Sequence, residues 1–166
     1  MRMRVGRSRD REGGAALVEF AVLAPLLLLL VLGIIEFGYL FGQFNEIRHA
    51  AREGGRYAAV SNPDLDGVSP INDADVVTSV CNALNLPGST TFDLAIRLVD
   101  SDGNTITGAG VLGDTGEVSI TANVVSLTSA PIISSFIPST LSNVTTFRVE
   151  QPTAWTSPLT QTGLSC

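Results

Sequence analysis

The sequence has few of the residues from which most catalytic and metal sites are built. Its 166 residues include one histidine, His49, so no Ser/His/Asp or Cys/His catalytic arrangement has a second histidine available. The two cysteines, Cys81 and Cys166, are far apart and lack the spacing of metal ligands. No glycine-rich phosphate-binding motif occurs. We therefore expect no enzyme activity, no cofactor and no metal site.

Lysine is also absent, and all ten basic residues are arginine. Five of these arginines lie before the first long apolar segment. The chain beyond residue 12 holds the other five against fourteen acidic residues, a net charge of −9 (5 − 14). A surface with this charge repels phosphate backbones, which excludes nucleic-acid binding.

Long hydrophobic segments are scarce except at one place. No charge occurs from Phe20 to Ile35, and the apolar character continues through Phe41, interrupted by Glu36. As a helix, residues 20–41 would span about 33 Å, enough to cross the apolar core of a bilayer. The five preceding arginines predict a single-pass membrane protein with its N-terminus inside and its C-terminal part outside, periplasmic or extracellular.

Two simpler explanations compete with a specialised role for this segment. A cleaved secretory signal has an apolar core of about 7–15 residues followed by small residues. This run is longer, and the aromatic-rich sequence at 37–41 follows it. A permanent signal anchor explains the hydrophobicity and the arginines equally well, but it does not explain Glu19. A carboxylate within a membrane helix is costly and usually faces a partner.

The sequence around this carboxylate resembles the processing site of Flp-type prepilins. Residues 14–20 read Gly-Ala-Ala-Leu-Val-Glu-Phe, and in that family a membrane aspartic prepilin peptidase cuts after the glycine. The resemblance implies cleavage between Gly14 and Ala15. It also implies that Glu19, followed by Phe20, would meet the new α-ammonium group of a neighbouring subunit. Such a charge pair would select one axial register between packed helices.

Two further motifs are similar to those of the TadE-like family, minor pilins or pseudopilins of tight-adherence (Tad/Flp) pili. Residues 33–38 read Gly-Ile-Ile-Glu-Phe-Gly, and residues 50–58 read Ala-Ala-Arg-Glu-Gly-Gly-Arg-Tyr-Ala, with Gly55 where alanine is usual. The resemblance covers residues 13–59 and implies a structural or assembly component of a Tad-type adhesion pilus. Its implied partners are a prepilin peptidase, other pilin or pseudopilin subunits and the lipid bilayer. The alternative is a permanent signal-anchored surface protein with an extracytoplasmic binding domain.

Several charged residues on this helix are candidate contact sites. Glu36 either reaches the outer membrane interface or pairs across helices in the assembly. A basic stripe with helical spacing follows the apolar run, formed by Arg48, Arg52 and Arg56. The stripe is either a solvated face that includes a Glu53–Arg56 pair, or a contact with lipid phosphate or with the acidic domain of a neighbour.

The remainder of the chain predicts an outer domain. An amphipathic helix is expected over Asp73–Leu84, and strands are expected where apolar and polar residues alternate, at residues 92–98, 118–124 and 145–151. The fold class is therefore α+β, with a long N-terminal transmembrane helix before a small pilin-like domain that has a short helix and an antiparallel sheet. The expected order is a basic leader at 1–14, the transmembrane and extended helix at 15–60, and the extracytoplasmic domain at 61–166.

Export across the membrane also bears on the cysteines and on two Asp-rich segments. Disulfides form in exported domains, so Cys81 and Cys166 are predicted to pair, with free thiols as the alternative. The segments at 64–67 and 100–104 have oxygen-rich sequences, but the second lacks the downstream bidentate Glu of a calcium-binding EF-hand. Both are predicted to be turns, because Asp, Asn and Gly are the usual turn residues.

Overall fold

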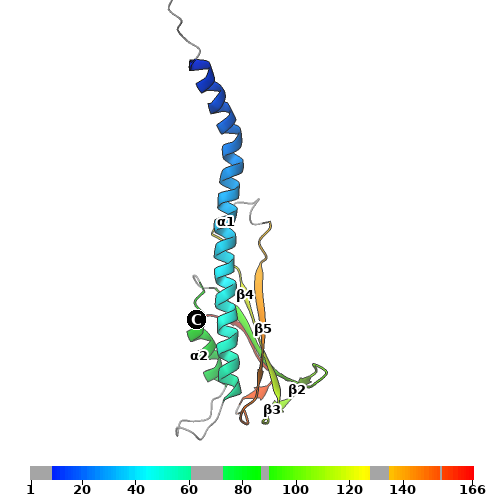
Figure 1. The fold of residues 1–166 in the computed structure, drawn as a ribbon. Coiled ribbons are helices and arrows are strands. Elements are labelled where there is room, and N and C mark those ends of the chain that lie inside the picture. The colour runs from blue at the N-terminus through cyan, green and yellow to red at the C-terminus, as the bar shows by residue number, and fades with distance from the viewer. Residues whose placement is uncertain (1–8, 61–72, 87–89, 128–134, 154) are drawn as a thin grey trace, which may run out of the picture. The chain divides into compact units, whose positions relative to one another are not determined.

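The computed structural model describes residues 9–60, 73–86, 90–127, 135–153 and 155–166. Its elements are α1 (Arg9–Ala59), α2 (Asp73–Ala83), β1 (Phe92–Val99), β2 (Thr105–Ile106), β3 (Gly108–Ala109), β4 (Thr115–Asn123), β5 (Thr140–Arg148), β6 (Thr156–Ser157) and β7 (Leu159–Leu164) (Figure 1). By its contacts the chain divides into two compact units between Gly38 and Tyr39. The predicted α+β class and the order of a long helix, a short helix and an antiparallel sheet are confirmed.

The first unit contains the N-terminal part of α1. The large apolar side chains from Leu17 to Phe37 are exposed, and a helix of this length and composition can cross a membrane. Pro25 lies inside the helix without ending it, as membrane helices tolerate. An uninterrupted helix that turns apolar side chains outward on all sides suits hydrocarbon rather than water, which indicates membrane anchoring.

The second unit is built on an antiparallel sheet. β4 pairs with β1 on one side and with β5 on the other, each along its full length. The second edge of β1 is shared, because β7 pairs with its first half and β2 with its last two residues. β3 and β6 form a separate two-stranded ribbon.

One face of the sheet packs against both helices and forms the core. Strand alternation places Leu94 and Ile96 of β1 opposite Ile120 and Val118 of β4 on this face, and all four are fully buried. The other side of the same cluster is formed by Ile47, Ala50, Ala51 and Ala58 of α1, by Val76 and Val80 of α2, and by Leu84, which directly follows α2. The small residues of α1 let the helix backbone approach the sheet and α2 closely.

The C-terminal end of α1 is capped by a segment that follows β5. The indole N–H of Trp155 donates to the carbonyl of Ala58 at 3.1 Å, and the backbone N–H of Glu150 donates to the carbonyl of Ala59 at 2.9 Å. Trp155 is fully buried and meets Phe147 edge to face, with ring centroids 6.2 Å apart. These donors satisfy carbonyls that the last turn of a helix leaves without intrahelical partners. Trp155 thus packs the C-terminal part of the chain against α1 and β5.

Both predicted helices and two of the three predicted strands are confirmed. α1 and α2 each end one residue before the predicted end, and β1 and β4 bury alternate residues as expected. The third strand was predicted at 145–151 and that range is wrong, because β5 begins at Thr140 and ends at Arg148. The next residue, Val149, bonds to the turn at Gly113 and Asp114, where Gly113 has a φ of 95°, so the regular ladder stops there.

The predicted disulfide and one predicted turn are also confirmed. Cys81 of α2 is bonded to Cys166, with a Cα–Cα distance of 5.4 Å. In the β1–β2 hairpin, Asp100 Oδ1 accepts the backbone N–H groups of Asp102 and Asn104 at 2.9 and 2.8 Å. These bonds, those from Asn104 above all, hold the pKa of the Asp100 carboxyl below its usual range. The other predicted turn, at 64–67, lies outside the described residues.

Candidate assembly surface on the long helix

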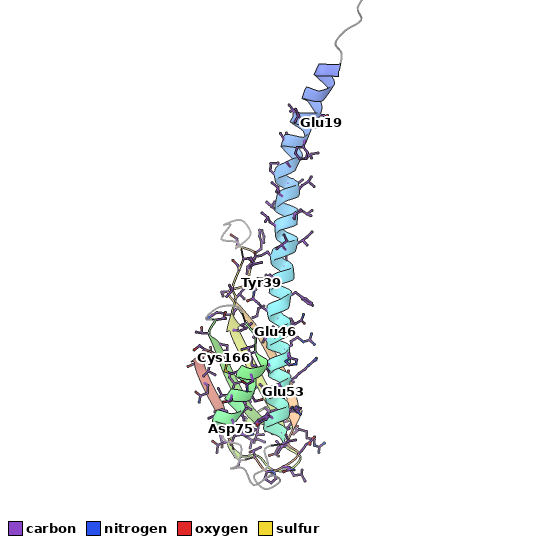
Figure 2. The ribbon with its side chains drawn as sticks, turned by 90° about the vertical axis from the view of Figure 1, so that its left-hand side faces the viewer. Glu19, Tyr39, Glu46, Glu53, Asp75 and Cys166 are labelled. Atoms are coloured by element: carbon purple, nitrogen blue, oxygen red, sulfur yellow. A yellow bond between two sulfur atoms is a disulfide. The ribbon has the colours of Figure 1, made fainter. Side chains whose placement is uncertain are left out.

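The site that the sequence predicted lies on the part of α1 in the first unit, where Gly14 and Glu19 are both helical and exposed. Figure 2 shows Glu19 near the start of the helix. Positions at spacings of four and three residues from Glu19 carry large apolar side chains or glycine, namely Leu23, Leu26, Leu30, Gly33 and Phe37. This spacing places them on one face of the helix, and they are mostly exposed. Glu19 therefore stands at the start of an apolar seam of the kind by which helices pack.

Three glycines leave the surface of α1 open to close approach. A Cβ atom built at Gly33, Gly38 or Gly42 would meet no heavy atom within 4 Å. Glycine in an apolar helix lets a second backbone come near, and membrane helices use this for packing. The helix thus offers exposed apolar area and recesses that nothing in the described part of the chain fills.

Glu36 differs from Glu19, since only 1% of its surface is exposed. Leu40 and Gln43 follow it by four and seven residues, so the three side chains lie on one face of α1, and all three are buried. The burial of this carboxylate could not be anticipated from the sequence. Its role in helix pairing stays a prediction.

The basic stripe consists of residues with different surroundings. The guanidinium of Arg48 lies 5.8 Å from the centroid of the Phe44 ring. Arg56 forms the predicted pair with Glu53, with 2.6 Å between Nη2 and Oε1, which raises the pKa of Arg56 and lowers that of Glu53. Arg52 is exposed. Two of the three arginines thus already have a neighbour within the chain, and the role of the stripe in assembly remains a prediction.

One residue that the sequence did not single out ties α1 to the segment that follows β4. The side-chain amide of Gln43 donates from Nε2 to the carbonyl of Val125 at 2.8 Å, and its Oε1 accepts the Val125 N–H at 3.1 Å. Gln43 is buried, with 4% of its surface exposed, so this two-bond clamp satisfies both of its polar ends. Helical spacing marks Gln43 as inward-facing, but nothing local indicates a partner so distant in the sequence.

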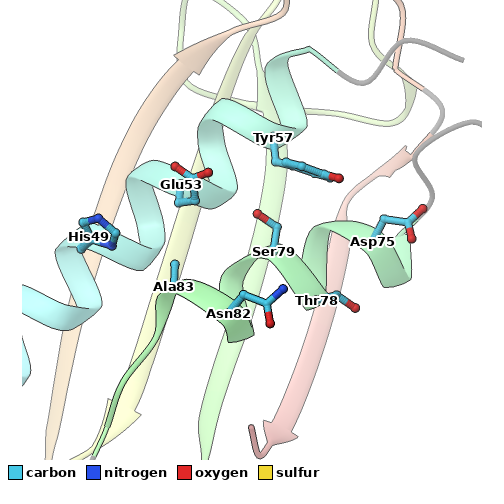
Figure 3. A pocket seen from close by; sticks show the side chains of 8 residues that line it. All are labelled: His49, Glu53, Tyr57, Asp75, Thr78, Ser79, Asn82 and Ala83. Carbon is cyan, nitrogen blue, oxygen red and sulfur yellow. The ribbon is translucent and has the colours of Figure 1, made fainter. Parts of the chain in front are cut away.

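A groove of about 450 Å³ runs between α1 and α2 within the second unit. It is lined by His49, Glu53 and Tyr57 from α1 and by Asp75, Thr78, Ser79, Asn82 and Ala83 from α2 (Figure 3). All of these side chains except that of Ala83 can form hydrogen bonds, and His49 is exposed. Among the described residues, no group of three or more His, Cys, Asp or Glu could hold a metal ion.

Residues 14–56 match the family model described as TadE-like protein. The match begins at Gly14 and ends at Arg56, so it includes Glu19, Glu36 and the arginine stripe but neither α2 nor the sheet. No curated protein and no solved structure matches the chain.

Proposed function

We propose that this chain, which carries a TadE-like domain at residues 14–56, is a minor pilin or pseudopilin of a Tad-type adhesion pilus. The observation that carries the proposal is the coincidence of this domain with a long helix whose apolar side chains are exposed. TadE-like proteins are pilin-like and generally structural rather than enzymatic. The function follows from the surface of the helix and needs no catalytic site.

The proposed precursor is inserted once through the membrane, with its basic leader inside and residues 61–166 outside. A prepilin peptidase then cuts between Gly14 and Ala15, which removes the leader arginines and leaves an α-ammonium group on Ala15. Glu19 of one subunit meets this group on a neighbour. Each charge offsets the burial of the other within an apolar bundle, so helices in the wrong axial register lose the pair and are disfavoured.

Support for this register role comes from the surroundings of Glu19. The Glu19 side chain is exposed at the start of an apolar seam. Packing within the chain therefore does not explain a carboxylate at this position. On insertion scales such a charge costs about 2.5–3.5 kcal/mol at the centre of a membrane helix and less near its end. A partner in the assembly removes that cost.

The N-terminus of the membrane-extracted protein tests the proposal. Intact-mass and N-terminal peptide measurements should find Ala15 as the first residue when the protein is made in cells that have a Tad-type prepilin peptidase. Replacing Gly14 by leucine should block cleavage, whereas the same change at the adjacent Gly13 should leave most chains processed. An intact arginine-rich leader on the wild-type protein in such cells would refute processing and favour the permanently anchored surface protein.

A further inference from the structure

The connection between β4 and β5 differs in composition from the rest of the outer domain. From Val118 to Phe147 the sequence contains no charged residue, although the chain is otherwise acidic beyond its leader. Large apolar side chains stand exposed in the described part of this connection: 55% of the surface of Leu127 and 76% of that of Phe136 are exposed. Exposed apolar side chains grouped in one uncharged loop mark a contact surface.

The structure fixes where this loop begins. The β4–β5 ladder continues past its last pair through a bond from the Val124 N–H to the carbonyl of Ser139 at 3.0 Å. The next residue, Val125, is held by both polar ends of Gln43. The base of the loop is therefore pinned to α1 at residue 43.

This attachment point lies just beyond the apolar run of α1. Gln43 follows Phe41, the last residue of that run, by two positions, a rise of about 3 Å along the helix. Leu127 follows Val125 by two residues and Phe136 precedes Ser139 by three, so both exposed side chains lie close to this pinned base and to the level at which the apolar run ends.

We propose that the β4–β5 loop inserts Leu127 and Phe136 into the interfacial region of the lipid bilayer, as a second membrane contact beside α1. The inference rests on the membrane anchoring in the proposed function. Phenylalanine and leucine are favourable at the boundary between headgroups and acyl chains, and without charges no carboxylate or guanidinium has to lose its hydration there. The Gln43 clamp attaches the loop to the anchoring helix itself. This attachment favours lipid over a second protein chain as the contact of the loop.

Depth-dependent fluorescence quenching in the full-length protein tests the proposal. Phe136→Trp and Leu112→Trp would each be reconstituted into vesicles of phosphatidylcholine brominated near the headgroup end of its acyl chains. Leu112 is the matched control, because its side chain is 70% exposed but lies in the turn before β4, at the other end of the sheet. The native Trp155 is fully buried and its signal is subtracted using the wild type. Leu28→Trp, within the apolar run, reports on the anchor itself.

We expect Phe136→Trp to lose at least about twice the fraction of its emission that Leu112→Trp loses, since an interfacial side chain sits about 5–10 Å into the boundary region. Equal, weak quenching of these two variants, with strong quenching of Leu28→Trp, would overturn the loop contact and leave the anchor standing. Weak quenching of all three would refute the anchoring. A blue shift of Phe136→Trp that appears only at high protein density, without quenching by brominated lipid, would assign the loop to a second copy of the chain and also overturn the proposal.

Discussion

Two adjacent glycines of α1 should respond in opposite ways to the same substitution. A Cβ atom at Gly54 would lie 2.6 Å from Cγ2 of Val80 on α2, closer than real side chains come, whereas a Cβ at Gly55 would lie 3.6 Å from Phe147 in ordinary contact. Both residues are buried within the same helix. The intrinsic gain from replacing glycine by alanine is therefore the same at both positions, about 1 kcal/mol.

The two variants differ in the packing term. Gly55→Ala adds no clash, so it should raise the free energy of unfolding by about 1 kcal/mol. Gly54→Ala forces α1 and α2 apart, and overpacking of this kind costs about 1–3 kcal/mol. After the gain in helix propensity is subtracted, Gly54→Ala should lower the free energy of unfolding by up to about 2 kcal/mol.

Urea unfolding of the full-length protein in detergent micelles, followed by the fluorescence of the buried Trp155, measures both values. Val80→Ala is the control, because it removes the methyl group with which the new Cβ would collide. In that background Gly54→Ala should become stabilising, which gives a coupling energy of about 1–3 kcal/mol between the two sites. If Gly54→Ala proves as stable as Gly55→Ala in the wild-type background, the close approach of the two helices at Gly54 is wrong.

Three further perturbations test other parts of the molecule. Glu19→Gln should leave membrane insertion intact and impair pilus assembly or processing, and unchanged pilus formation would contradict the register role. Replacing Cys81 and Cys166 together by serine should lower the free energy of unfolding by about 2–5 kcal/mol, measured by urea unfolding. If the wild-type protein has the same urea midpoint with and without reductant, the bridge contributes nothing to stability. Because its pKa is lowered in the fold, Asp100 should stabilise the β1–β2 hairpin fully above its unfolded pKa of about 3.9 and lose this effect as the pH falls through the lowered value. The thermal midpoint of Asp100→Asn should therefore approach that of the wild type only below about pH 4. If the difference in thermal midpoint between the two proteins is the same at every pH, the stabilising role of the Asp100 carboxylate is wrong.

The elements that the sequence predicts well are those whose patterns are local. The apolar run defines the anchor by length alone, and β1 shows its alternation in the residues themselves, with Leu94 and Ile96 buried and Asp93 and Arg97 exposed. The disulfide prediction follows from the anchor, because the expected export makes pairing of the two cysteines the simplest outcome.

The elements that the sequence does not predict depend on partners far away in the chain. β5 places Asn143 and Thr145 on its core-facing side, half-buried opposite Ile120 and Val118, so its sequence shows no apolar alternation. β7, with the sequence Leu-Thr-Gln-Thr-Gly-Leu, is a strand because the edge of β1 is available to it. The same reason applies to the Gln43 clamp and to the need for glycine at position 54, since their partners lie on other elements.

The second TadE-like motif, at residues 50–58, acquires a physical explanation from the structure. Its small residues Ala50, Ala51, Gly54 and Ala58 all face the core, where α1 packs closely against α2 and the sheet. Arg52 and Arg56 occupy the positions between them and are exposed. The Glu53–Arg56 pair at the surface contributes only a few tenths of a kcal/mol. Stability of the domain therefore accounts for the small residues of the motif but not for its arginines, and their contact with other subunits or with lipid phosphate stays a prediction.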